Sequence, residues 1–98
     1  MKINRMQAMP TARPTDIGAR LGLLRKIRNL RQNQVCAATG IPANTYNNYE
    51  RGRTRPDTDN GIALCVFFGV TMDYLYLGNM AGVPFDTAKE IESLINID

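Results

Sequence analysis

The sequence contains 98 residues, of which 44% are hydrophobic and 21% are charged, and its formal net charge is +3. A chain of this length forms one domain with a small core, and no apolar run approaches the roughly 18 residues that cross a bilayer. It has no histidine, which removes the commonest general base and the commonest zinc ligand. Cys36 and Cys65 lie in apolar stretches, which favours reduced, buried thiols. We therefore expect no enzyme, no catalytic residue, no metal site and no cofactor.

Charge is divided unevenly along the chain. Residues 1–55 hold eleven of the twelve lysines and arginines and only two acids, and so carry +9, whereas residues 56–98 hold one lysine and seven acids and carry −6. This division predicts a basic surface for a polyanion and an acidic surface that faces elsewhere, with an uneven solvated surface as the alternative. A membrane partner fits poorly, because the basic half lacks a long helix with one strongly apolar face.

The first part of the chain predicts an arm and a helix. Residues 1–14 contain two prolines and no sustained period, which indicates a flexible N-terminal arm. Asp16 is expected to cap a helix at its N-terminus, and Asn29, which tolerates the left-handed conformation, is expected to end it. The apolar positions of this helix repeat at helical spacing: Ile17, Leu21, Leu24 and Ile27.

Two short helices are predicted next, over residues 32–39 and 43–50, with Gly40-Ile41-Pro42 between them. Glycine supplies an unusual backbone angle for the turn, and proline suits the first turn of the second helix. Ile41 is expected to be buried in the core beneath the turn. The side chain of Cys36 is small, which allows the two helices to cross closely. This layout is typical of a helix-turn-helix.

A basic loop at residues 51–56 leads into the C-terminal half. Helices are predicted over 58–68, with Asp57 as the N-cap, and over 72–77, with Thr71 as the N-cap. We expect the helix over 58–68 to be the most buried, and its apolar positions are Ile62, Cys65, Val66 and Phe68. A last helix is predicted near 87–96, because Thr87 and Glu90 have the spacing of a capping box.

Asparagine dominates the outward face of the helix over 43–50. When Tyr46 and Tyr49 face inward, the residues left facing outward are Ala43, Asn44, Asn47 and Asn48. Asparagine is a poor helix former, but it bonds bidentately to adenine in the major groove, and alanine suits contact with a thymine methyl. These four residues are the predicted base contacts, and a solvated polar face is the alternative.

Several motifs extend this interpretation beyond the turn. They are Leu21-x-x-Leu24-Arg25, Leu30-Arg31-Gln32, Gly40-Ile41-Pro42-x-x-Thr45-Tyr46-x-x-Tyr49-Glu50-Arg51-Gly52, Arg55-Pro56 and Gly69-Val70-Thr71-Met72-Asp73-Tyr74-Leu75. With them, residues 17–78 resemble the lambda-repressor-like, Cro/CI-type helix-turn-helix proteins, also called the XRE family. The resemblance implies an all-α domain of five helices at residues 15–78, whose third helix enters the major groove. Residues 79–98 would add a loop and an extra C-terminal helix.

Arg31 stands where the family often has a capping Ser or Thr, so weaker capping is expected at the start of the helix over 32–39.

The same resemblance assigns roles to polar residues around the two short helices. Gln32 begins the first of them, where its N–H and side chain suit a phosphate. The other expected contacts to the DNA backbone are Thr45, Arg51, Arg53 and Arg55. Arg25 and Glu50 match positions that form an ion pair in the family.

The sequence therefore predicts a sequence-specific, double-stranded DNA-binding transcriptional regulator in a bacterial or phage-infected cytoplasm. We expect a repressor that binds a palindromic operator as a homodimer, with no small-molecule effector domain, because the chain ends about where the DNA-binding fold ends. The last helix, with Phe85, Ala88, Ile91, Leu94 and Ile95 at helical spacing, is the favoured dimer element, and packing on its own domain is the alternative. Two other functions remain open: an antitoxin whose residues 79–98 bind a toxin, and a protein-interaction module that does not bind DNA.

Overall fold

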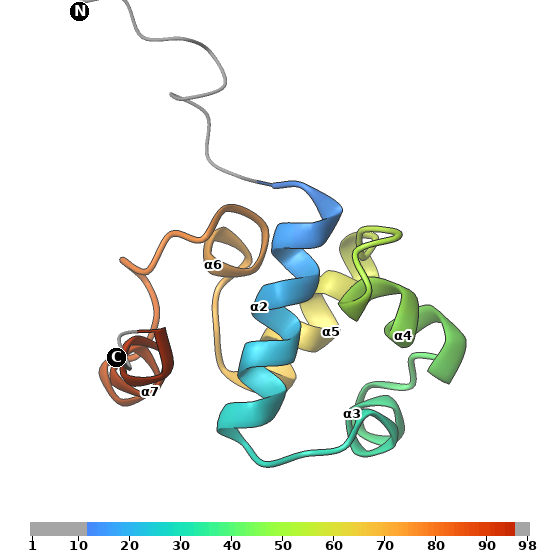
Figure 1. Cartoon of the computed structure of the whole chain (residues 1–98), viewed down its shortest axis with the longest axis horizontal. Coiled ribbons are helices and arrows are strands. Elements are labelled where there is room, and N and C mark those ends of the chain that lie inside the picture. The colour runs from blue at the N-terminus through green and yellow to red at the C-terminus, as the bar shows by residue number, and fades with distance from the viewer. Residues whose placement is uncertain (1–11, 96–98) are drawn as a thin grey trace, which may run out of the picture.

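The computed structural model describes residues 12–95 of the chain, and every regular element in that range is an α-helix. The helices are α2 (Pro14–Ile27), α3 (Gln32–Thr39), α4 (Ala43–Glu50), α5 (Thr58–Phe68), α6 (Met72–Leu77) and α7 (Phe85–Ile95). Helix α2 runs through the middle, with α4 on one side, α6 on the other and α5 behind (Figure 1). The expected all-α fold with an extra C-terminal helix is confirmed. No helix within the described range has both the length and the apolar character that crossing a bilayer requires.

The N-terminus of α2 differs from the prediction. The helix begins at Pro14, Arg13 is its N-cap, and Asp16 lies in the first turn, so the prediction that Asp16 caps the helix was wrong. The fixed φ of proline suits the first helical position, and the carboxylate of Asp16 instead accepts a hydrogen bond of 2.9 Å from Nε of Arg13. Residues 12–14 therefore belong to the folded domain, and the rest of the predicted arm lies outside the described residues.

The C-terminus of α2 follows the prediction. Asn29 has a φ of 56°, the left-handed conformation that was expected to end this helix. Its N–H donates to the carbonyl of Lys26, and the N–H of Leu30 donates to the carbonyl of Arg25. Leu30 then packs against the core, so this turn directs the chain back toward α3.

The core gathers around α2, and every helix from α2 to α7 contributes to it. Its buried hydrophobic residues are Ile17, Leu21, Leu24, Val35, Ile41, Tyr46, Tyr49, Leu64, Cys65, Phe68, Tyr74, Leu75, Val83 and Ile91. Both cysteines are unpaired, as expected, although Cys36 is only half-buried. Burial raises the pKa of the Cys65 thiol to about 11, which keeps this thiol protonated at neutral pH.

Helix α5 turns a different face inward from the one predicted. Ile62 and Val66 were expected in the core but are 47% and 77% exposed. Residues 60–68 carry no charge, so apolar side chains surround the helix and their period does not indicate the buried side. The inward face is instead Gly61, Leu64, Cys65 and Phe68. A side chain on Gly61 would collide with the hydroxyl of Tyr76 in α6.

Helix α7 packs back on its own domain. It begins at Phe85 rather than near residue 87, and Ile91 is fully buried. The capping role predicted for Thr87 was wrong, because its side chain lies in the first turn and accepts a hydrogen bond of 3.2 Å from Arg28. Arg28 also donates to the carbonyl of Phe68 at the end of α5 and reaches Glu90. Residue 96, the predicted end of this helix, lies outside the described residues.

Helices α2 and α4 approach each other closely at one glycine. An added Cβ at Gly18 would collide with the carbonyl oxygen of Tyr49 and would lie 2.8 Å from that of Glu50. At Gly22, one turn further along the same helix, an added Cβ would meet only a carboxylate oxygen of Glu50 at 3.8 Å. The backbone of α4 therefore rests directly on the backbone of α2.

This contact predicts opposite effects for two alanine substitutions. Gly18→Ala should lower the free energy of unfolding by about 1–3 kcal/mol, because α2 and α4 must move apart. Gly22→Ala should leave it unchanged or raise it by up to about 1 kcal/mol, through helix propensity alone. Urea denaturation of both variants measures the difference, and equal stabilities would show that the close approach is absent.

Candidate nucleic-acid interface

The turn between α3 and α4 has the geometry expected of a helix-turn-helix. Gly40 adopts the left-handed conformation with a φ of 78°, and its N–H donates to the carbonyl of Cys36. Ile41 is buried beneath the turn, and Pro42 precedes the first residue of α4. Arg31 offers no capping acceptor to α3, but the side chain of Gln34 accepts a 2.8 Å hydrogen bond from the backbone N–H of Arg31. This bond satisfies one backbone group at the helix start.

Two tyrosines hold α4 against the rest of the domain. Tyr46 and Tyr49 are both buried, as predicted, and their rings meet edge to face with centroids 6.5 Å apart. The hydroxyl of Tyr49 accepts a hydrogen bond of 2.9 Å from the side chain of Asn60 in α5. Burial and the adjacent Glu50 carboxylate raise the pKa of Tyr46, so this phenol stays protonated.

An ion pair joins the end of α4 to α2. Nε and Nη2 of Arg25 donate to the two carboxylate oxygens of Glu50 at 2.7 and 2.9 Å, which confirms the predicted pair. Arg25 also donates to the carbonyl of Leu30, in the connection from α2 to α3. The carboxylate is little exposed, at 10%, against 22% for the arginine side chain. A bidentate pair of this kind fixes orientation as well as distance.

The same carboxylate receives Gln32 of α3, whose side-chain amide donates to it at 3.2 Å. Burial by itself raises the pKa of Glu50, but hydrogen bonds from Arg25 and Gln32 outweigh it and hold the pKa below its usual range. The structure thus directs the side chain of Gln32 toward Glu50. Because the side chain of Gln32 is bound to Glu50, the expected phosphate contact would come from the backbone N–H of Gln32 at the start of α3.

The outward face of α4 holds the four predicted base contacts together. Ala43 and Asn44 are exposed, and Asn47 and Asn48 are half-exposed. Helical spacing places all four on the side opposite Tyr46 and Tyr49. Thr45, expected at the DNA backbone, is half-buried at the edge of this face.

Three exposed arginines follow α4 in the loop that leads to α5. Nη1 of Arg53 donates to Oδ1 of Asn48 at 3.4 Å, and Nε of Arg55 donates to the carbonyl of Ala12 at 2.7 Å. Arg51 is exposed at the end of α4. The loop lies against the start of α2, because a Cβ added to Gly52 would be 2.8 Å from Cα of Thr15. Neither of these contacts, at Asn48 and at Ala12, was predicted from the sequence.

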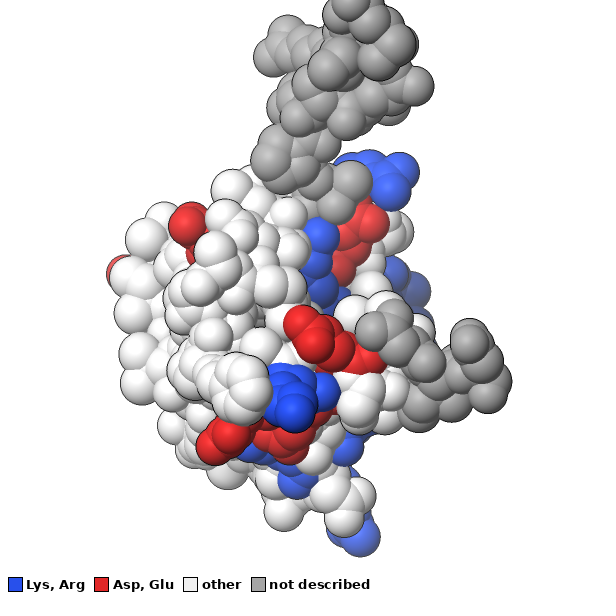
Figure 2. Space-filling model, turned by 90° about the vertical axis from the view of Figure 1, so that its left-hand side faces the viewer, with Lys and Arg blue, Asp and Glu red and all other residues white. Residues whose placement is uncertain are grey.

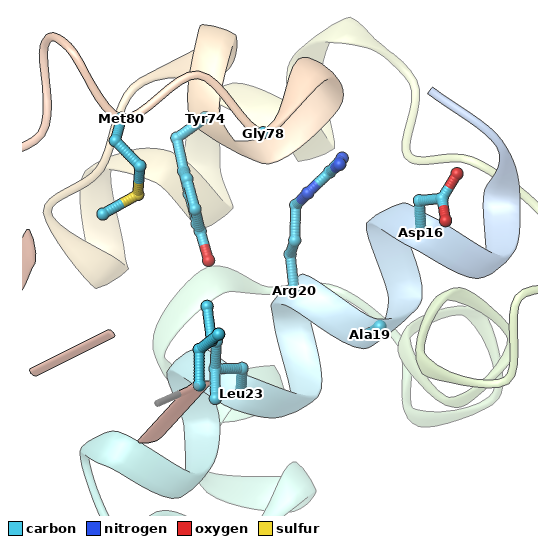
Figure 3. Close-up of a pocket in the computed structure, with 8 residues that line it drawn as sticks. Asp16, Ala19, Arg20, Leu23, Tyr74, Gly78 and Met80 are labelled. Carbon is cyan, nitrogen blue, oxygen red and sulfur yellow. The ribbon is translucent and has the colours of Figure 1, made fainter. Parts of the chain in front are cut away.

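A groove on the other side of α2 is separate from this surface. It has a volume of about 390 Å³, and its lining includes Leu23 of α2, Tyr74 of α6 and Met80. Figure 3 shows Arg20 on α2 beside Tyr74 and Gly78. Nη1 of Arg20 donates to the carbonyl of Leu75, so this arginine stabilises the end of α6. The groove lies between α2 and α6, whereas α4 lies on the other side of α2 (Figure 1).

A model of the helix-turn-helix family matches residues 21–75, from α2 into α6 and more than half of the chain. The chain belongs to this family. The XRE type expected from the sequence is thereby confirmed, and membership supports a DNA-binding regulator. Among solved structures, this helix-turn-helix protein is similar to a transcriptional regulator from Listeria innocua. The identity is 24%, the match covers 84% of this chain and 78% of that chain, and the TM-score is 0.58. This likeness shows the fold. No curated protein matches the chain.

The Glu50 carboxylate predicts a pH dependence of stability. Because its pKa is lower when folded than when unfolded (about 4.3), its contribution is present above pH 4.3 and is lost as pH falls through the folded pKa. Wild-type stability should therefore fall from about pH 5 downward more steeply than that of Glu50→Gln. At neutral pH this substitution should cost about 3 kcal/mol, because it leaves Arg25 without its partner charge.

Urea denaturation between pH 3 and pH 7 measures both effects. Asp16→Asn is the matched control, because Asp16 pairs with Arg13, whose side chain is 69% exposed. An exposed pair contributes little to stability, so this variant should follow the wild type throughout. Parallel pH profiles for Glu50→Gln and wild type would contradict the role given to Glu50.

Proposed function

We propose that this chain is a sequence-specific, double-stranded DNA-binding transcriptional regulator that places α4 in the major groove. One observation carries the proposal: α4 is anchored through Tyr46, Tyr49 and Glu50, while its opposite face presents Ala43 and the three asparagines to solvent. A short helix with one face fixed and the other polar is what a base-reading element needs. Family membership supports the DNA-binding regulator, and the roles of individual residues are part of the proposal.

The asparagines are suited to reading bases by hydrogen bonding. Each amide offers one acceptor and two donors, the pattern that pairs with N6 and N7 of adenine. At Asn48 a guanidinium can only donate, so the contact with Arg53 turns Oδ1 toward that residue and leaves the NH₂ group and the second lone pair of Oδ1 for a base. Arg53 therefore has two roles in the proposal, orienting Asn48 and contacting phosphate.

The arginines after α4 supply contacts to the DNA backbone. Arg51, Arg53 and Arg55 are exposed and occupy alternate positions in the loop that follows α4. Phosphate contacts position the protein without selecting a sequence and make binding strongly dependent on salt. Thr45 and the N–H of Gln32 would add contacts at the other edge of α4.

Binding as a dimer to a palindromic operator completes the proposal. An eight-residue recognition helix reads few base pairs, and two of them about 34 Å apart read enough for a specific site. A dimer on such a site would repress by covering DNA that the polymerase requires.

Selection of bound duplexes from a random pool tests this function. We expect an inverted repeat with A/T positions in each half-site. Absence of any enriched sequence, together with weak dependence of binding on salt, would overturn the proposal and favour a module that binds proteins.

The base contacts predict selective losses. Asn44→Ala and Asn48→Ala should each weaken binding to the selected site by about 1–3 kcal/mol and relax the preference at one position of each half-site. Binding to random duplex should change little. Titrations at fixed salt measure both quantities, and full specificity in both variants would mean that another surface reads the bases.

The arginines predict two different outcomes. Arg51→Ala should weaken binding to all sequences alike and reduce the slope of log K against log salt by about one unit. Arg53→Ala should do the same and also relax the preference at the position that Asn48 reads. The double variant Asn48→Ala/Arg53→Ala should lose no further preference there. If Arg53→Ala weakens binding to all sequences alike and leaves the base preference unchanged, then Arg53 does not orient Asn48.

A further inference from the structure

The loop at residues 51–56, called the arginine loop below, is exposed in its middle and fixed where it joins α5. Arg53 and Arg55 are exposed, whereas Pro56 is buried. The hydroxyl of Tyr76, in α6, donates to the carbonyl oxygen of Pro56 at 2.7 Å and lies 3.3 Å from that of Asp57. A side chain from a different helix therefore holds the end of this loop.

A glycine in α5 makes room for this hydroxyl. Gly61 is buried, and an added Cβ there would collide with the hydroxyl of Tyr76 and would lie 3.1 Å from Cε2 and Cζ of its ring. Glycine is less favourable than alanine inside a helix, and the space that Tyr76 occupies is a physical reason for glycine at this position. Burial raises the pKa of Tyr76, so the phenol keeps its proton and remains a donor at neutral pH.

The arginine loop is also fixed before it reaches Pro56. A Cβ added to Gly52 would lie 2.8 Å from Cα of Thr15, so the backbone there rests on the start of α2. Nε of Arg55 donates to the carbonyl of Ala12. This bond uses one nitrogen of the guanidinium, and the two terminal nitrogens can donate to phosphate oxygens. The loop is thus held in place on both sides of its exposed arginines.

Tyr76 itself lies away from the candidate DNA-binding surface. It is half-buried in α6, and α6 lies across α2 from α4 (Figure 1). Figure 2 views the molecule from the side where Figure 1 places α6 and α7. On this side acidic and basic side chains lie next to one another, beside a broad area without charge. A polyanion favours a basic surface, so an effect of Tyr76 on DNA binding would pass through the arginine loop.

We propose that Tyr76 is a positioning residue for DNA binding, which holds the arginine loop through the carbonyl of Pro56 so that Arg53 and Arg55 meet phosphate groups. The inference rests on the proposed function and deepens it, because it names the side chain that orders the phosphate-contacting loop. A loop that is ordered before binding loses less conformational entropy in the complex. Without the hydroxyl the arginines are still present, so the number of contacts stays the same and only the cost of ordering them rises.

Tyr76→Phe tests this role by removing the hydroxyl alone. Binding to the selected duplex and to random duplex should both weaken by about 3- to 10-fold, because the loop must be ordered on binding. The base preference and the slope of log K against log salt should stay as in the wild type. Arg55→Ala, which removes a contact, should instead reduce that slope by about one unit. Urea denaturation verifies that the variants are folded under the binding conditions.

Two further single variants separate the hydroxyl bond from other effects. Gly61→Ala should weaken binding as Tyr76→Phe does, because its methyl group displaces the hydroxyl of Tyr76, although alanine favours the helix. Tyr74→Phe is the matched control. Tyr74 is a buried tyrosine of the same helix, and it lies at the groove between α2 and α6 (Figure 3). This variant should bind DNA like the wild type.

The order of the loop can be measured without DNA. In the free protein, order parameters of the backbone N–H groups of Arg53 and Arg55 should fall in Tyr76→Phe and stay unchanged in Tyr74→Phe. A double variant, Tyr76→Phe/Arg55→Ala, then joins loop order to binding. Its loss of affinity should be smaller than the product of the two single losses, because a loop without Arg55 gains less from being held.

Several results would overturn the inference. They are wild-type affinity in Tyr76→Phe, an equal loss of affinity in Tyr74→Phe, unchanged order parameters in Tyr76→Phe, and independent losses in the double variant. A reduced salt slope in Tyr76→Phe would contradict it too, since the hydroxyl would then lie at a phosphate contact. Failure of the proposed function looks different: the wild-type protein itself would show weak, salt-insensitive binding and select no sequence. The order parameters would then still decide whether Tyr76 fixes the loop.

Discussion

The carboxylate of Glu50 lies where α2, α3 and α4 meet, and the orientation of α4 depends on it. It accepts both donors of the Arg25 fork and the amide of Gln32. Arg25 in turn holds the carbonyl of Leu30 in the connection before α3. A single carboxylate and its arginine partner thus fix the end of α4, the start of α3 and the connection between α2 and α3. The close approach at Gly18 allows this arrangement, because it brings the C-terminus of α4 onto the backbone of α2.

Much of the fold could be predicted because backbone constraints interrupt the sequence at the correct places. Three helices end at a glycine in the left-handed conformation, namely Gly40, Gly69 and Gly78, and Asn29 has the same conformation after α2. Asp57 and Thr71 cap the following helices as their positions suggest. Two predicted N-caps were wrong, because local spacing does not show which residue begins a helix or which distant side chain binds the expected cap. Pro14 begins α2 ahead of Asp16, and Thr87 is taken by Arg28, which is 59 positions away in sequence.

The candidate site was predictable in its helix but only partly in its side chains. Inward tyrosines and outward asparagines follow from helical spacing alone. The partners of the arginines do not, because they come from distant parts of the chain. Arg20, Arg25 and Arg28 bind carbonyl and carboxylate groups of the domain itself. The basic surface is therefore smaller than the charge of residues 1–55 indicates, and three of its exposed arginines lie in the loop after α4. Similarly, residues 60–68 of α5 carry no charge, so the sequence does not indicate which side of this helix faces water.

The two sides of α4 use different residues, and this separation makes the helix open to redesign. Tyr46, Tyr49 and Glu50 hold the helix in place, whereas Ala43, Asn44 and Asn47 contribute little to that attachment. New outward residues can thus be introduced without repacking the core, as long as they are compatible with a helix. The domain can serve as a fixed frame for alternative recognition sequences, with Asn48 and Arg53 exchanged as a pair because they contact each other.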